Sequence, residues 1–78
     1  MTKIPRISGN VMIKYLTKKE FFVINRKGSH VSLTNKNRFT TVPAGNTRLK
    51  IGTLLAILQD SMITREEFVK DYNIGLVK

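Results

Sequence analysis

Apolar residues near the start of the chain recur with the period of a helix. Met12, Ile13 and Leu16 fall on one side at helical spacing. Ser8 precedes them and is of a residue type that favours the first cap of a helix. The pattern therefore predicts a helix from Ser8 to about Lys18.

The middle of the chain is predicted to form three short strands. Aromatic and β-branched residues are concentrated there in runs that are too short for helices. Polar turn residues separate the runs, and Pro43 ends the last of them. The predicted strands cover residues 21–24, 30–34 and 39–42, and the predicted turns cover residues 27–29 and 35–37.

The second of these strands has a strict alternation of apolar and polar side chains. Val31 and Leu33 share one face, and His30, Ser32 and Thr34 share the other. If the apolar face covers a core, the polar face is open to solvent or to a ligand.

Helical spacing returns in the last third of the chain. It predicts a helix that starts near Gly52 or Thr53 and ends near Ser61. Thr64 and Glu67 have the spacing of a capping box, which predicts a short last helix. The apolar residues of these two helices are Ile51, Leu54, Leu55, Leu58, Phe68 and Val69.

The order of elements predicts an α+β fold. A helix, three strands joined by hairpin-length turns and a second helix form a three-stranded antiparallel sheet with the helices on one face. The chain has 78 residues, which predicts one domain over residues 1–78. The aromatic residues Phe21, Phe22, Phe39 and Phe68 are expected to supply core.

The charge is strongly positive and unevenly distributed. The net charge is +9, and Glu20 is the one acidic residue before Asp60. Basic proteins favour polyanionic partners, because binding a phosphate releases counterions. Charge alone leaves nucleic acid, an anionic membrane and an acidic protein as alternatives.

Several classes of site are disfavoured by the residues present. The chain has one histidine and no cysteine, so no cluster of metal ligands and no disulfide is expected. Glycine-rich phosphate loops and a G-x-S-x-G turn are missing from the sequence. Without a long apolar run or a signal-peptide pattern, we expect a soluble cytoplasmic protein with no cofactor.

The segment Arg26-Lys27-Gly28-Ser29-His30 is the best candidate for chemistry. It places an imidazole, which gives or takes a proton near neutral pH, beside two cations that suit a phosphate. The alternative is structural: a surface histidine without a role, two turn formers and a solvated edge of the sheet. The alternation of the strand favours the first interpretation, because it places His30 on the open face.

The ordered set of motifs resembles the HicA family of toxin ribonucleases over nearly the whole chain. Ser8-Gly9 resembles the start of the first helix, and Glu20 stands where the family more often has glycine. The run 26–30 resembles the R-x-x-G-S-H signature, one residue tighter, with Val31 in place of the second histidine of many members. Further matches are Thr41-Val42-Pro43, Leu49-Lys50, Gly52-Thr53-Leu54, Ile57-Leu58 and 63–68.

The resemblance implies a fold like the double-stranded RNA-binding domain, metal-independent cleavage of messenger RNA, and inhibition by a HicB antitoxin. It implies a catalytic role for His30, as general base or as the acid for the leaving oxygen. The residues expected to contact RNA are Arg26, Lys27, Gly28, Ser29, Arg48 and Lys50. Two alternatives remain: a non-catalytic RNA-binding module, and a basic protein that binds an acidic partner.

Overall fold

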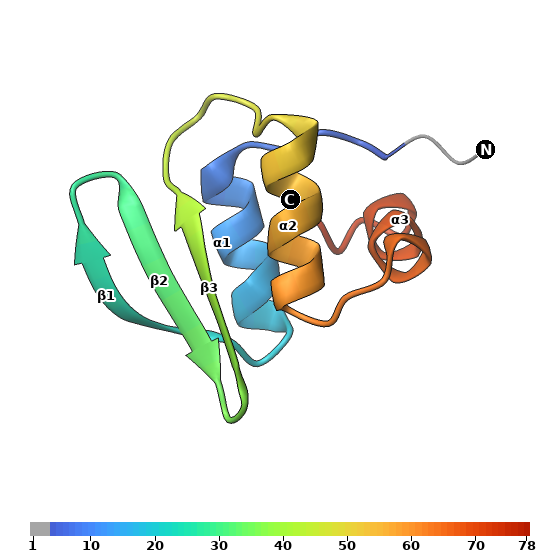
Figure 1. The fold of residues 1–78 in the computed structure, drawn as a ribbon. Coiled ribbons are helices and arrows are strands. Elements are labelled where there is room, and N and C mark those ends of the chain that lie inside the picture. Colours follow the sequence, from blue (N-terminus) through green and yellow to red (C-terminus); the bar gives the residue numbers. More distant parts are fainter. Residues whose placement is uncertain (1–3) are drawn as a thin grey trace.

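The computed structural model describes residues 4–78 and shows one helix, three strands and two further helices (Figure 1). The helices are α1 (Gly9–Lys18), α2 (Ile51–Asp60) and α3 (Arg65–Asn73). The strands are β1 (Phe22–Lys27), β2 (His30–Asn35) and β3 (Arg38–Pro43), and they form one antiparallel sheet in that order. The predicted α+β fold is confirmed.

Two of the helices begin at the caps that the sequence predicts. The Ser8 hydroxyl accepts a hydrogen bond from the Val11 N–H at 3.2 Å. The Thr64 hydroxyl accepts one from the Glu67 N–H at 3.1 Å. The helix α2 begins at Ile51, slightly earlier than predicted, after a residue that provides no side-chain cap.

All three helices end in the same hydrogen-bonded backbone motif. After α1, the Phe21 N–H bonds to the Leu16 carbonyl at 3.0 Å and the Glu20 N–H bonds to the Thr17 carbonyl at 3.3 Å. This is the Schellman motif, and it requires a residue with positive φ directly after the cap. The motif recurs after α2 and α3, and the positive-φ residues are Glu20 (71°), Met62 (59°) and Gly75 (83°).

The strand β1 carries a bulge. Its register with β2 shifts between Val23 and Asn25, so that Ile24 is the extra residue. A single extra residue reverses the alternation of faces along the rest of the strand. In a regular strand, two residues five positions apart lie on opposite faces of the sheet. Because of the bulge, Phe22 and Lys27 lie on the same face.

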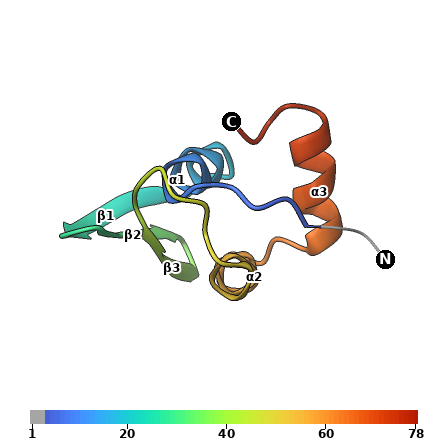
Figure 2. The same cartoon turned by 90° about the horizontal axis from the view of Figure 1, so that it is seen from above.

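The core lies between one face of the sheet and the helices. β2 contributes Val31 and Leu33 to it, and β3 contributes Thr40 and Val42, each at most 2% exposed. The helices α1 and α2 lie beside β3, whereas β1 extends away from them (Figure 2). The opposite face of the sheet is open, as the alternation predicts.

Two of the four phenylalanines lie outside this core. Phe21 and Phe68 are buried as predicted, but Phe22 and Phe39 are each 57% exposed, so for them the prediction is wrong. Phe22 lies opposite Thr34, on the face of the sheet that the helices do not cover. Its strand β1 is exposed on the other face too, because it extends away from the helices. Phe39 is paired with Thr34 on the open face of the sheet.

A polar cluster joins α3 to α1. The Tyr15 hydroxyl donates a hydrogen bond to the Asp71 carboxylate at 2.7 Å, and Lys19 Nζ lies 2.8 Å from Asp71 and 2.9 Å from Glu67. Burial alone would raise the pKa of Asp71, but hydrogen bonds from Lys19 and Tyr15 outweigh it and lower this pKa. Burial and the bond to Asp71 raise the pKa of the Tyr15 hydroxyl far above its ordinary value. The Tyr15 and Phe68 rings also pack edge to face at 5.5 Å.

Over residues 4–78, none of the helices combines the length and the apolar character that crossing a bilayer demands.

Candidate functional site

His30 is the first residue of β2 and is exposed on the open face of the sheet. Its direct neighbours across the sheet are Lys27 on β1 and Pro43 on β3. Residues that are directly opposite in an antiparallel pair share a face and have Cα atoms about 5 Å apart. The structure therefore places Lys27 and His30 next to each other on one face of the sheet, as the sequence predicts.

Arg26 is separated from this pair. Its register partner is Val31, which is 2% exposed and belongs to the core face. The Arg26 side chain therefore leaves the sheet on the side opposite to His30, although it is exposed because β1 extends past the helices. Of the two adjacent cations, the structure brings only Lys27 to the histidine.

Gly28 and Ser29 form the two-residue turn between Lys27 and His30. Gly28 has φ 60°, a conformation that glycine adopts without strain and that suits a tight hairpin. The Ser29 carbonyl accepts a hydrogen bond from the Ala44 N–H at 2.6 Å. The turn thus holds His30 in place and connects it to the loop after β3.

The loop after β3 is fixed on the start of α1. The Asn10 N–H bonds to the Gly45 carbonyl at 3.0 Å, and the Gly45 N–H bonds to Asn10 Oδ1 at 2.9 Å. At Gly9 a Cβ would lie 1.7 Å from the carbonyl oxygen of Pro43, so only glycine fits under this strand end. Local patterns cannot reveal Asn10 as a positioning residue, because its partner lies 35 residues away.

This loop carries the two remaining predicted cations. Arg48 and Lys50 are exposed and line a hollow of about 350 Å³ together with Pro43 and Ala44. Since Pro43 is the cross-strand neighbour of His30, these cations lie at the same end of the sheet as the histidine. The candidate site is therefore an exposed imidazole with Lys27 on one side and the Arg48–Lys50 loop on the other.

The electrostatic character of this surface is uniform. Residues 21–59 contain six lysines and arginines and no acidic residue. His30 thus has no carboxylate partner on its own sheet or on the loop beside it. Within residues 4–78, no group of three or more histidine, cysteine or acidic side chains is placed to hold a metal ion. The arrangement favours an anion with phosphate chemistry.

Comparison with known proteins identifies the family. The sequence profile described as HicA toxin of bacterial toxin-antitoxin matches residues 9–63, which span α1, the whole sheet and α2. Neither the curated proteins nor the solved structures gave a match. The profile covers more than half of the chain, and the chain therefore belongs to the HicA family of toxins from bacterial toxin–antitoxin systems.

Proposed function

We propose that this toxin is an endoribonuclease that cleaves messenger RNA in the cytoplasm, with His30 as its catalytic residue. The observation that carries the proposal is the position of His30: exposed on an open sheet face, beside Lys27, in a sheet and an adjoining loop that contain no acidic residue. An imidazole supplies proton transfer near neutral pH, and the cations supply affinity for the phosphate backbone.

Such a site can cleave RNA with few groups. The His30 imidazole takes the proton from a ribose 2′-hydroxyl, and the 2′-oxygen attacks the adjacent phosphorus. The bond from phosphorus to the 5′-oxygen then breaks, and the leaving oxygen takes a proton from water or a second donor. The products are a 2′,3′-cyclic phosphate and a 5′-hydroxyl. No step requires a metal ion.

Lys27 is the group best placed to stabilise the transition state. Negative charge accumulates on the phosphate oxygens during the attack, and a fixed cation beside the base opposes that charge. Arg48 and Lys50 contact neighbouring phosphates in this proposal, whereas Arg26 on the other face does not. Gly28 and Ser29 act through the turn that sets the position of His30.

Chemically altered substrates test the mechanism. An RNA with one 2′-deoxyribose at the cleaved position should resist cleavage there, because the attacking hydroxyl is missing. The unmodified RNA should yield a 2′,3′-cyclic phosphate end, with or without EDTA. Cleavage at the deoxy position would contradict the mechanism. Binding without cleavage of any RNA would instead favour the non-catalytic RNA-binding module.

The family implies a cognate antitoxin. We propose a HicB-type protein that covers His30, Lys27 and the Arg48–Lys50 loop with an acidic surface, since this would block catalyst and substrate binding together. Excess single-stranded RNA should then compete with the antitoxin for the toxin. A complex in which the antitoxin binds with undiminished affinity to the RNA-saturated toxin would contradict this arrangement.

A further inference from the structure

Two exposed aromatic rings on the open face of the sheet have no role in the site described so far. Phe22 and Phe39 are each 57% exposed. Both are register partners of Thr34, one across β1 and the other across β3, so all three share the face that carries His30. Neighbouring strands are about 4.8 Å apart, which places the two phenylalanine backbones about 10 Å from each other across the sheet.

The fold itself does not need these rings on this face. The buried core is built from the other side of the sheet and from the helices, and neither phenylalanine belongs to it. Single exposed apolar residues are ordinary, but a pair of aromatic rings in cross-strand register on one open face indicates a binding surface. The bulge at Ile24 keeps Phe22 on the same face as Lys27.

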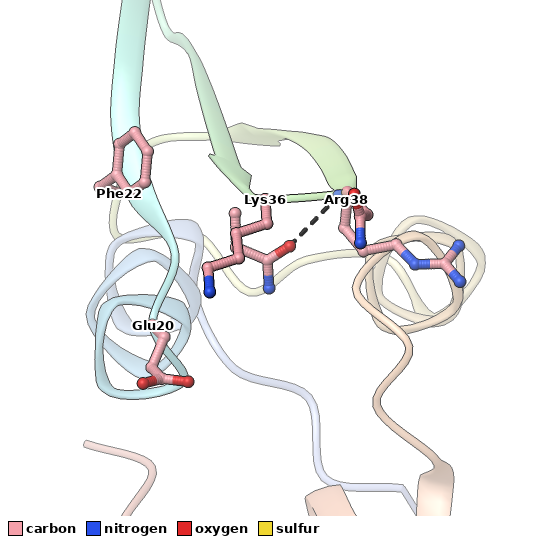
Figure 3. A pocket seen from close by; sticks show the side chains of 6 residues that line it. Glu20, Phe22, Lys36 and Arg38 are labelled. Carbon is pink, nitrogen blue, oxygen red and sulfur yellow. Dashed lines mark hydrogen bonds between the residues drawn. The ribbon is translucent and has the colours of Figure 1, made fainter.

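The chemistry around Phe22 suits a nucleotide. Phe22 lines a pocket of about 510 Å³, of a size that holds small ligands. Figure 3 shows Glu20 and Phe22 on one side of it and Lys36 and Arg38 on the other. The cations suit a phosphate, and the carboxylate and the amides of the lining can hydrogen-bond to base edges. The remaining lining residues are Asn35 and Asn37.

The distance to the candidate catalytic residue fits one continuous strand of RNA. Thr34 and His30 lie four positions apart on the same face of β2, which corresponds to about 13 Å along the strand. An unpaired strand covers that distance with a few nucleotides. Bases stacked on the rings would therefore belong to the same RNA segment as the phosphate at His30.

We propose that Phe22 and Phe39 form a platform on which unpaired bases of single-stranded RNA stack, a few nucleotides from the cleaved phosphate. The proposal rests on the proposed function and adds the substrate class, since bases in a duplex are already stacked and do not offer their faces. Aromatic side chains on an open sheet bind unpaired bases in other RNA-binding folds.

The alternative is that these rings contact the antitoxin. The polar Thr34 between them interrupts the continuous apolar patch that the centre of a protein interface has.

The test measures RNA binding apart from cleavage. In the full-length His30→Ala protein, both phenylalanines are changed together, to leucine in one variant and to tyrosine in the other. Leucine keeps the apolar character and removes the aromatic face, whereas tyrosine keeps that face. The probes are a fluorescein-labelled single-stranded oligoadenylate, the same strand with abasic riboses, and a duplex of the same length.

The leucine pair should weaken oligoadenylate binding at least about tenfold, and the tyrosine pair should keep it within about threefold. Binding of the abasic strand and of the duplex should not change, because both lack free base faces. Equal oligoadenylate binding by the leucine pair and the parent would overturn the platform. A leucine pair that binds oligoadenylate like the parent but no longer binds the antitoxin would also overturn the platform. It would assign the rings to the protein interface. Failure of cleavage by the parent enzyme would affect only the proposed function, since binding is measured without His30.

Discussion

At the scale of single residues, the site depends on which face of β1 each cation occupies. Lys27 and Arg26 are adjacent in sequence and both are exposed, but only Lys27 pairs with His30. Lys27 and Arg26 therefore provide a matched comparison of two side chains that carry the same charge on opposite faces of the sheet.

Lys27→Ala should lower the rate of RNA cleavage by about tenfold or more, because a cation next to the reacting phosphate is lost. Arg26→Ala should change the rate by about twofold or less, since its side chain leaves the sheet on the other face. Single-turnover cleavage of one RNA by the two variants makes the comparison. Equal losses would show that both side chains reach the substrate.

Asp71 is a residue whose contribution to stability depends on pH. Its pKa in the folded protein is below the ordinary 3.8, so its ionised form stabilises the fold above that pH. The contribution is lost as the pH falls through the folded pKa. Asp71→Asn should lower the free energy of unfolding by about 1–3 kcal/mol at neutral pH.

The difference between Asp71→Asn and the parent should shrink as the pH is lowered from neutral to below the ordinary pKa of 3.8. Urea unfolding followed by circular dichroism at several pH values measures it. A difference that is constant over that range would mean that Asp71 does not keep its charge through Lys19 and Tyr15.

At the scale of elements, the helix ends show conformational strain. Glu20 and Met62 occupy the positive-φ position of a Schellman motif, where a residue with a side chain is disfavoured by about 1–2 kcal/mol. Gly75 occupies the same position after α3 without that strain. The side chains of Glu20 and Met62 at these positions therefore have a structural cost.

Glu20→Gly and Met62→Gly should each raise the free energy of unfolding by about 0.5–1 kcal/mol, since relief of strain exceeds the entropy that glycine adds to the unfolded chain. Glu20→Ala is the control, because it removes the carboxylate and keeps the strain. Thermal unfolding compares the variants. A destabilised Met62→Gly protein would contradict the strained geometry.

The elements themselves could largely be predicted from the sequence. Helix starts follow from local caps, as at Ser8 and Thr64, because the capping bond spans three residues. The ends of α1 and α2 are harder to predict, since neither Glu20 nor Met62 is the glycine that usually marks them. The open face carrying His30 follows from simple alternation.

Other features depend on long-range packing. The exposure of Phe22 follows from its position opposite Thr34 on the open face of the sheet, which the pattern within one strand cannot show. The separation of Arg26 from His30 follows from register across a hairpin with a bulge, which depends on the partner strand. The docking of Asn10 on the loop after β3 likewise joins segments that are distant in the sequence.

At the scale of the whole molecule, stability and the proposed activity use different sides of the sheet. The helices cover one face, with α3 attached to α1 through the cluster around Asp71 (Figure 2). The other face holds His30 and the exposed rings. The acid-free segment 21–59 supplies the sheet and the loop beside it with positive charge only.

This charge should make RNA binding steeply dependent on salt. Each phosphate contact contributes about 0.7 to the slope of log affinity against log salt for single strands, and a total slope of about −3 is expected. Lys50→Ala should make the slope shallower by about one contact, whereas Lys70→Ala on α3, across the molecule from the sheet, should not. Fluorescence titrations over a salt series measure the slopes. A flat dependence would exclude binding through phosphates.

In the proposed mechanism, His30 performs the proton transfer in RNA cleavage. The most direct test is the single-turnover cleavage rate of His30→Ala, measured beside its unfolding free energy and its RNA affinity. The rate should fall at least about 100-fold. Stability should stay within about 0.5 kcal/mol, because the residue is exposed and outside the core. RNA affinity should persist, because the cations are unchanged. A folded His30→Ala protein that cleaves RNA at the parent rate would contradict the account.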